Sequence, residues 1–356
     1  MTALSPATIH DIAKKAKVTS ITVSRVFNHP ELVKLETRVK ILAIAKELNY
    51  LPNVFAQGLK KYHSNIIGIV TDSMFNPFYS ASIQTISRIA KARGYQIMLF
   101  DTDGDEKAEQ QAIETLLSYK ANGILLSPIR DDREYHPDYI KILKYYKTPL
   151  ILIDRDFYNA SFPGIFLNDP QIGRVAGQFL AKQKSKKILI VGGPQNSQIT
   201  QLRLNGMMES LKNTDKQIYT LFTNYAFTNI DPKLIFEQLA KIAHEPFWVI
   251  GLNGIITTGM IDFITRFEST STKKIDVSYF SVDEAPYARQ YGLKIPGVYH
   301  NTIYLGEQAA MLLFKLIENK NDLNKHKSSV NMNKIKPQSE LEHNERIIID
   351  GVLSAF

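Results

Sequence analysis

The sequence predicts an all-α N-terminal unit followed by an α/β core of two doubly wound parallel-sheet lobes. Residues 8–48 place apolar side chains at helical spacing in three short segments. From residue 65 onward, short apolar runs alternate with amphipathic helical segments, which is typical of parallel sheets covered by helices on both faces. The chain has 356 residues, more than one hydrophobic core usually serves. We therefore expect two lobes rather than one large sheet.

Composition and charge restrict the class of protein. Hydrophobic residues make up 44% and charged residues 22%, as in ordinary globular proteins, and there is no cysteine for a disulfide, a thiolate nucleophile or a Cys-ligated zinc site. The sequence has neither a secretion signal pattern nor an apolar run of about 18 residues, so we expect a soluble, cytoplasmic protein without membrane contact. Residues 1–63 hold eight Lys and two Arg against four acidic residues, which is +6 of the total +8. Such a concentration of positive charge indicates a polyanionic partner.

The first two predicted helices are short and closely spaced. "SPATIHDIAKKAKVTS" has Thr8 as a cap with Asp11 three residues later, and "SITVSRVFN" restarts the helical period after a brief interruption. Two short helices joined by a turn of three to four residues form a helix-turn-helix. A third helix is expected in "KLETRVKILAIAKELNY". The residues expected to face inward are Val23, Val26 and Phe27 in the second helix and Val39, Leu42, Ala43, Ala45 and Leu48 in the third.

The outer face of the second helix carries small or hydrogen-bonding residues and one long bidentate donor: Ser20, Ile21, Ser24 and Arg25. Such a face can approach base edges closely in a major groove, and Arg can pair with guanine O6 and N7. The alternative is a small amphipathic bundle that packs on the rest of the protein. A solvated helix of that kind more often carries Glu and Lys on this face.

"TIHDIAKKAKVTSITVSRVFNHPELVKLETRVKILAIAKELNYLPNVFAQGLK" resembles the DNA-binding headpiece of the LacI/GalR (lactose-repressor) family, including its "TVSRV", "T-R", "LNY-PN" and "A-x-x-L" landmarks. Lys17 stands where that family usually has Gly in the turn, so either its backbone is not left-handed or the turn is strained. The resemblance implies that Ser20, Ile21 and Arg25 face bases. It also implies that phosphates are held mainly by Thr8, Ser24, Asn28, His29, Thr37 and Arg38.

"YLPNVFAQGLKKYHSN" follows as a hinge or linker. Pro52 ends the third helix and Asn53 can cap a helix of about two turns, which is marginal alone because Gly58 costs about 1 kcal/mol relative to Ala. By resemblance, this hinge folds when two copies meet over the minor groove, with Asn53, Ala56 and Leu59 at the DNA and Leu59 wedged between base pairs. The alternative is a linker with a buried leucine.

We expect three segments of the chain: a helix-turn-helix domain (1–52), a hinge (53–64) and a core (65–356). Within the core, one lobe is expected to comprise about 65–164 plus 298–325 and the other about 165–297 plus 340–356. Residues 319–345 are polar and aperiodic and are expected to form a mobile surface loop before "RIIIDGVLSAF" returns as a strand. No C-terminal leucine heptad supports a tetramerisation bundle. The strands are expected at 65–71, 95–101, 121–128, 148–154, 186–193, 247–253 and 275–283.

Ligands of doubly wound folds bind beyond the carboxyl ends of the strands. Hydroxyl-binding, anion-binding and aromatic side chains gather there, the mixture that a sugar site requires. For each residue alone, a strand-end cap or a surface ion pair is the simpler interpretation. The candidate effector-binding residues are Asp72, Phe78, Tyr79, Ser127, Asp154, Arg155, Arg203, Asn253 and Asp283.

The core also resembles the family's effector-binding part, which is similar to periplasmic sugar-binding proteins, in "NPFYS", "LIDRDF" and "LRLNGMMESL". The resemblance places Arg203, Asn253 and Asp283 at the effector. Gly254 follows Asn253 where Asp is common, and "YFSVDE" replaces the usual Gly-Phe-Asp-Asp. "DRDF", "LFTNYAFT" and "RIIIDGVLS" are similar to the fructose-repressor branch, whose effectors are sugar phosphates. A phosphorylated sugar therefore ranks beside a free one.

These observations favour a repressor of a carbohydrate-metabolism operon, controlled allosterically by a small sugar or sugar phosphate. It would bind pseudo-palindromic double-stranded operator DNA as a homodimer and signal through the hinge. The alternatives are a sugar-binding transport component without a DNA role and an enzyme on a doubly wound fold. "VGGPQNS" is neither a Walker nor a dinucleotide motif, and the eight histidines show no paired metal spacing. We therefore expect no catalysis, no cofactor and no metal.

Overall fold

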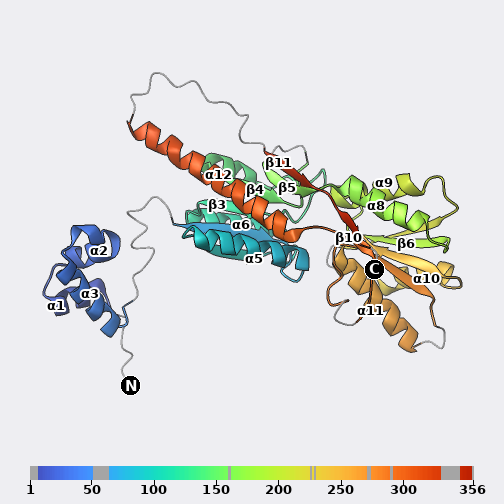
Figure 1. The fold of residues 1–356 in the computed structure, drawn as a ribbon, viewed down its shortest axis with the longest axis horizontal. Coiled ribbons are helices and arrows are strands. Elements are labelled where there is room, and N and C mark those ends of the chain that lie inside the picture. Colours follow the sequence, from blue (N-terminus) through green and yellow to red (C-terminus); the bar gives the residue numbers. More distant parts are fainter. Residues whose placement is uncertain are drawn as a thin grey trace. The chain divides into compact units, whose positions relative to one another are not determined.

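A computed structural model describes residues 7–50, 64–158, 162–224, 227, 230–270, 274–288, 292–329 and 345–354, with side chains in the last helix as far as Asp322. The chain divides into two compact units, Met1–Ser64 and Asn65–Phe356 (Figure 1). The predicted hinge residues Asn53, Ala56 and Leu59 lie outside the described residues.

The first unit contains the predicted helices α1 (Ile9–Ala16), α2 (Ser20–Asn28) and α3 (Leu35–Glu47), with the 3-10 turn η1 (Pro30–Leu32) between the last two. Thr8 caps α1 in a capping box: its hydroxyl accepts from the Asp11 amide at 3.3 Å, and its own amide donates to the Asp11 carboxylate at 2.8 Å. The Thr8 hydroxyl also donates to the Asp11 carboxylate at 2.6 Å, and the hydrogen bonds from the Thr8 hydroxyl and amide to this carboxylate lower the pKa of Asp11. Thr19 caps α2 through the Thr22 amide at 3.2 Å. The caps satisfy helix-end amides that would otherwise lack intrahelical partners.

The core of this unit corrects the predicted inward face of α3. Ile41 and Ala45 are buried, whereas Ala43 is exposed, Val39 is 58% exposed and Leu42 is 45% exposed. Apolar residues occur all round α3, so periodicity alone does not select a face; packing on α1 does. The buried residues of this core are Ile12, Ala13, Ala16, Val23, Val26, Ile41 and Ala45, and Phe27, Ile44 and Leu48 pack against them.

Lys17 ends α1 in the left-handed conformation, with φ 57° and ψ 46°. The Val18 amide donates to the Ala13 carbonyl at 3.0 Å, which satisfies a helix-end acceptor. The sequence leaves open whether Lys17 avoids the left-handed conformation or the turn is strained, and the structure has the strained, left-handed turn.

The second unit contains two six-stranded sheets, one in each lobe. The first sheet is parallel throughout, in the order β11-β5-β4-β3-β1-β2. Its strands are β1 (Ile66–Thr71), β2 (Gln96–Asp101), β3 (Gly123–Leu126), β4 (Leu150–Ile153), β5 (Gly164–Leu167) and β11 (Arg346–Ile349).

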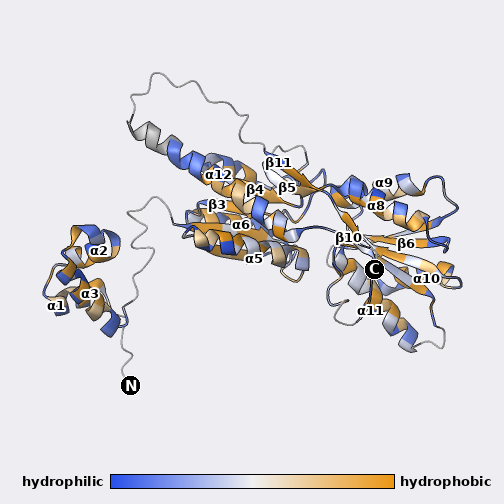
Figure 2. Cartoon of the chain, viewed as in Figure 1, coloured by the Kyte–Doolittle hydropathy of each residue, from blue (hydrophilic) through white to orange (hydrophobic). Residues whose placement is uncertain are grey.

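The second sheet has the order β12-β10-β9-β8-β6-β7, and only the pairing of β10 with β12 is antiparallel. Apolar strands run through the middle of both lobes (Figure 2). The strands of this sheet are β6 (Lys187–Gly192), β7 (Gln217–Phe222), β8 (Phe247–Gly251), β9 (Val277–Val282), β10 (Gly297–Tyr299) and β12 (Val352–Ser354).

Helices cover both faces of each sheet. In the first lobe, α5 (Pro77–Ala92) and α12 (Thr302–Ser329) pack on one face, while α6 (Glu106–Ser118) and α7 (Tyr139–Tyr146) pack on the other. In the second lobe, α8 (Asp169–Ala181) and α9 (Gln198–Leu211) oppose α10 (Pro232–Ile242) and α11 (Gly254–Thr270). The chain passes between the lobes after β5, after β10 and after β11 (Figure 1). This arrangement confirms the predicted architecture.

Three boundaries differ from the prediction. Strand β5 belongs to the first sheet, whereas the prediction places residues from 165 onward in the second lobe. The strand escapes prediction because the four-residue run "GIFL" is too short to identify by its pattern. Residues 340–356 were expected in the second lobe. Of the two described strands in this segment, β11 joins the first sheet and β12 joins the second. Helix α12 continues to Ser329, which contradicts the predicted loop over 319–329. A helix nucleated by packing on α5 extends through polar residues at little further cost.

Candidate functional site

The outer face of α2 has the composition and exposure that base recognition requires. Ile21 is 65% exposed and Arg25 is exposed, while Val23 and Val26 on the same helix are buried. The Ser24 hydroxyl accepts from the Asn28 side-chain amide at 3.1 Å. Of the residues predicted to face bases, Ile21 and Arg25 therefore lie exposed on the outer face of α2, and Ser20 is half-buried.

His10 lies beside this surface and was not predicted from the sequence. Its Nδ1 is 3.0 Å from the Ser20 hydroxyl, and its side chain is exposed. No sequence pattern distinguishes His10, because it is a lone histidine inside a short helix.

Of the predicted phosphate contacts, Thr8 is exposed but serves as the α1 cap, and His29 lies 3.3 Å from a carboxylate oxygen of Glu31. Thr37 and Arg38 lie half-buried at the start of α3.

In the first lobe, the ends of β1, β3 and β4 and the first turn of α5 bring five predicted effector residues together. The Tyr79 hydroxyl lies 2.8 Å from that of Ser127 and donates to the Asp154 carboxylate at 3.0 Å. Arg155 donates to the Asp72 carboxylate at 2.6 Å and to the Pro128 carbonyl at 3.0 Å. The side chains of these residues thus orient one another.

In the second lobe, Arg203 of α9 is the centre of a buried cluster. Its Nε donates to Asp169 at 2.7 Å, and one Nη donates to the Leu252 carbonyl at 2.7 Å and lies 3.8 Å from Asp283. Nε2 of His300 lies 2.8 Å from the other oxygen of Asp283. Neither Asp169 nor His300 was predicted from the sequence: Asp169 begins α8, two residues after the end of the unpredicted strand β5, and His300 directly follows β10.

The two clusters face each other across a cleft between the lobes. Its cavity is about 30 Å³, close to the volume of one water molecule and far below the roughly 300–1,000 Å³ of ligand pockets. A ligand of sugar size therefore does not fit the cavity in this arrangement of the lobes. Asp72 and Ser127 do not line the cavity. Each contacts a residue that does: Asp72 contacts Arg155, and Ser127 contacts Tyr79. The predicted residues that line the cavity are Phe78, Tyr79, Asp154, Arg155, Arg203, Asn253 and Asp283.

Asn253 has a structural role as well as a place in the lining. Its side-chain oxygen accepts from the Ile256 amide at 2.7 Å, at the beginning of α11. The strand-end cap that was the simpler interpretation is therefore present at this position.

Burial and neighbouring charges set the ionisation of the cleft. Burial raises the pKa of Asp154 to about 6, against an ordinary 3.8, although Arg155 and Arg203 oppose the increase. Burial also raises the pKa of Asp169, opposed by Arg203. Burial would raise the pKa of Asp283 too, but His300 and Arg203 outweigh it and lower that pKa. Asp154 and Asp169 therefore take up a proton more readily than Asp283 does.

A wider groove of about 550 Å³ opens beyond Phe78 and Asp283, bounded by Leu293, Ile295 and His300. It is more spacious than the cleft, but neither Arg155 nor Arg203 lines it. The convergent polar groups therefore identify the cleft as the candidate ligand site. Among the described residues, no group of His, Asp and Glu is arranged to hold a metal ion, and no helix is long and apolar enough to span a bilayer.

The fold and the cleft define the class of protein: a two-lobed ligand-binding core preceded by a helix-turn-helix unit. Residues 64–281 match the family described as periplasmic binding proteins and sugar binding domain of LacI family, and residues 8–53 match bacterial regulatory proteins, lacI family. The chain belongs to the LacI family of bacterial regulatory proteins. Members of this family are transcription regulators rather than enzymes, which agrees with the expectation of no catalysis.

Individual relatives carry different names. The chain is 32% identical to the ribose operon repressor of Escherichia coli K12 over 207 residues, which are 58% of this chain and 62% of that protein. The match thus spans less than two thirds of that repressor. The chain is also 28% identical to the HTH-type transcriptional repressor PurR of Mannheimia succiniciproducens over 318 residues, 88% of this chain and 93% of the other.

Solved structures share the fold. The lac repressor dimer bound to operator and the anti-inducer ONPF has a TM-score of 0.72 at 21% identity, covering 99% of this chain and 98% of that one. The Cra transcriptional dual regulator of Pseudomonas putida in complex with fructose 1-phosphate has a TM-score of 0.66 at 15% identity, covering 82% and 98%. At these identities the likeness concerns the fold alone.

Proposed function

We propose that this protein is a transcriptional repressor of a carbohydrate-metabolism operon, which binds pseudo-palindromic operator DNA as a homodimer and is controlled by an uncharged sugar. The observation that carries the DNA role is the open face of α2, where Ile21 and Arg25 are exposed on a helix that the headpiece core fixes in place. The net charge of +6 on residues 1–63 supports phosphate contacts along the same unit. The lac repressor, which shares this fold, binds its operator as a dimer, and this likeness supports the homodimer.

The charges of the cleft favour an uncharged effector over a sugar phosphate. Arg155 is paired with Asp72, and Arg203 is paired with Asp169 and lies near Asp283. With Asp154 included, four carboxyl groups face two guanidinium groups. A phosphate would have to displace a buried carboxylate from its arginine, and the displaced charge would be left buried without a partner. Sugar hydroxyls can instead both donate to carboxylates and accept from guanidinium groups.

A thermal-shift panel tests the effector class, because a ligand that binds only the native state raises its stability. The panel contains D-ribose and other uncharged sugars, fructose 1-phosphate and other sugar phosphates, and a purine base. We expect the midpoint of unfolding to rise with an uncharged sugar only. A rise confined to a sugar phosphate would contradict the charge argument, and one confined to the purine would exclude a sugar effector.

The DNA role is tested with operator sites recovered by selection from random DNA with the wild-type protein. Arg25→Ala should lower the ratio of operator to random-DNA affinity by about tenfold, equivalent to losing one bidentate base contact. Lys15→Ala, which removes a charge on α1 that is paired with Glu47, is the matched control. An unchanged ratio for Arg25→Ala would show that Arg25 does not read bases. Failure to recover any selected site would contradict the DNA role.

A further inference from the structure

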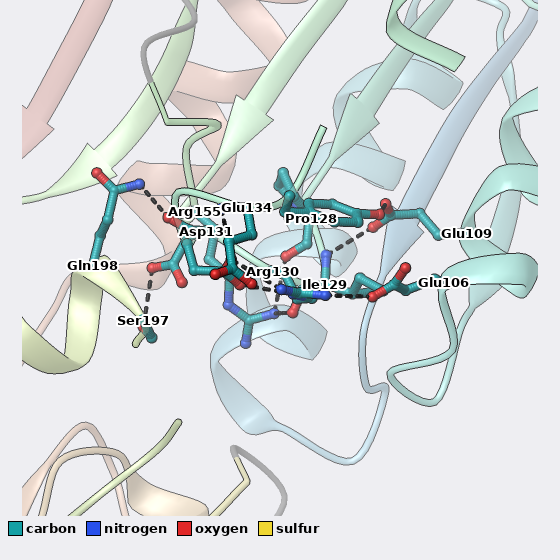
Figure 3. A network of polar contacts seen from close by, with 12 residues as sticks. Glu106, Glu109, Pro128, Ile129, Arg130, Asp131, Glu134, Arg155, Ser197 and Gln198 are labelled. Atoms are coloured by element: carbon teal, nitrogen blue, oxygen red, sulfur yellow. Dashed lines mark hydrogen bonds and ion pairs between the residues drawn. The ribbon is translucent and has the colours of Figure 1, made fainter. Parts of the chain in front are cut away.

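Asp131, a buried residue in the loop between β3 and α7, contacts the second lobe (Figure 3). Its carboxylate accepts from the Ile199 amide at 2.9 Å and from the Ser197 hydroxyl at 3.1 Å. Its backbone carbonyl accepts from the side-chain amide of Gln198. Asp131 is 2% exposed and Ser197 1% exposed, so these hydrogen bonds are shielded from water. All three partners lie at the start of α9 in the opposite lobe.

The position of this carboxylate makes the contact strong. Ser197 is the N-cap of α9 and Ile199 lies in its first turn, where the backbone amides of a 14-residue helix present partial positive charge. A carboxylate is the favoured partner for such amides, and hydrogen bonds to an ionised acceptor are about twice as strong as neutral ones. The contact therefore favours the arrangement in which the lobes are together.

The loop that carries Asp131 is held rigidly by the first lobe (Figure 3). Arg130 binds the Asp132 carboxylate through Nε at 2.7 Å and Nη at 2.9 Å, and it reaches Glu106 at 2.8 Å. Glu109 accepts from the Ile129 amide at 2.7 Å. Asp131 is thus presented to α9 in a preset position, which lowers the entropy cost of making the contact.

Both ends of the contact are joined to residues that line the effector cavity. Arg155 donates to the carbonyl groups of Pro128 and Ile129 just before Asp131, at 3.0 and 3.4 Å. Arg203 lies on α9, about one turn after the Asp131 contact. A change of contacts at either arginine therefore acts directly on one side of the Asp131 contact. Asp131 does not line the cavity, whereas its partner Ile199 does.

We propose that Asp131 is a latch that holds the two lobes closed by binding the N-terminus of α9. The latch contributes to the balance between open and closed lobes through Asp131, which does not itself line the effector cavity. Its consequence for DNA control rests on the proposed function: an effector entering the cleft must release the latch, and one that fits the closed cleft re-forms it.

The absence of cysteine from the chain allows a direct measurement of closure on the free protein. Lys107→Cys on α6 and Glu237→Cys on α10 are exposed positions on opposite lobes for spin labels. Pulsed electron resonance then gives the distribution of distances between the lobes without effector or DNA. In this background, Asp131→Ala removes the carboxylate and Gln198→Ala removes the contact from the other lobe. Asp138→Asn is the matched control, since its exposed carboxylate pairs only with Lys141 in the described residues.

We expect Asp131→Ala to increase the ratio of open to closed lobes by about tenfold or more, equivalent to one charge-assisted hydrogen bond. Gln198→Ala should increase the ratio by less, and Asp138→Asn should leave it unchanged. Gln198→Ala also provides the test if Asp131→Ala fails to fold, which circular dichroism would reveal. Unchanged distances in the folded latch variants would overturn the latch and leave the proposed function intact. A wild-type protein that binds no selected DNA would contradict the proposed function and leave the distance result standing.

Discussion

Asp154 and Asp283 occupy corresponding positions in the two lobes: each directly follows a parallel strand, β4 or β9, and each has a left-handed backbone, with φ 67° and 66°. Left-handed conformations are costly for residues other than Gly and tend to persist at functional sites. The two carboxyl groups nevertheless differ electrostatically. Burial dominates at Asp154 and raises its pKa, whereas His300 and Arg203 outweigh burial at Asp283 and lower its pKa. The two aspartates therefore share a backbone conformation, whereas their pKa values shift in opposite directions.

The raised pKa of Asp154 predicts a specific dependence of stability on pH. Its pKa rises from 3.8 to about 6 on folding, so the folded state binds the proton more tightly. The free energy of unfolding should fall between pH 4 and about 6.5, by up to roughly 3 kcal/mol from this group alone. Asp154→Asn should remove this component, as measured by urea denaturation followed by circular dichroism. Asp138→Asn, at an exposed site, should retain the wild-type curve. Parallel curves for wild type and Asp154→Asn would show that Asp154 does not titrate in this range.

The strained turn at Lys17 predicts a stabilising substitution. A non-glycine residue in the left-handed region costs roughly 1–2 kcal/mol. Glycine removes this cost, but part of the gain in stability is lost because glycine makes the unfolded chain more flexible. Lys17→Gly should therefore slow hydrogen exchange of the buried amides of Ile12 and Val23 by an amount equivalent to about 0.5–1 kcal/mol. Lys14→Gly removes the same charge inside α1 and should accelerate that exchange. Faster exchange in Lys17→Gly would contradict the strain argument.

The headpiece could be predicted from the sequence because its signals are local. Thr8 and Thr19 cap helices whose amides lie within a few residues, and Val23 and Val26 sit one helical turn apart. The inward face of α3 could not be predicted, since its apolar residues surround the helix and the choice of Ile41 over Val39 depends on contacts with other helices.

The candidate cleft was predicted residue by residue but not as a network. Strand ends identified Asp154 and Asp283 because parallel strands bring their carboxyl ends to one edge. Arg203 lies in a helix and was predicted from the family resemblance. Asp169 is 34 residues from Arg203 in the chain, and it follows a strand too short to recognise. Contacts between lobes, such as that of Asp131 with Ile199, depend on how two separately folded sheets meet. No local pattern in the sequence carries that information.

The hinge prediction concerns Leu59, which lies outside the described residues. If Leu59 wedges between base pairs, Leu59→Ala should weaken binding to a selected operator by about tenfold or more, because the unstacked step loses its apolar filling. The thermal shift produced by an effector should stay unchanged. Leu59→Met keeps an apolar side chain of similar size and should retain most of the affinity. Fluorescence anisotropy titrations measure the affinity, and equal values for wild type and Leu59→Ala would exclude the wedge.

The loop that carries Asp131 depends on one buried carboxylate, Glu109, which is 0% exposed. Its Oε1 accepts from the hydroxyl groups of Tyr135 and Tyr139, both at 2.5 Å, and its Oε2 accepts from the Ile129 amide. Burial raises the pKa of Glu109, and the two tyrosines oppose this increase. Glu109→Ala would leave three buried donors without their acceptor and create a cavity.

We expect Glu109→Ala to lower the free energy of unfolding by roughly 3 kcal/mol or more, as measured by urea denaturation at pH 7. Glu114→Ala, on the same helix but exposed, should cost less than about 0.5 kcal/mol. Because the loop position depends on Glu109, spin labels at the two lobes should also report a larger open fraction in Glu109→Ala than in Glu114→Ala. A Glu109→Ala protein as stable as the control would mean that water replaces the carboxylate at no cost, and that the loop does not require Glu109.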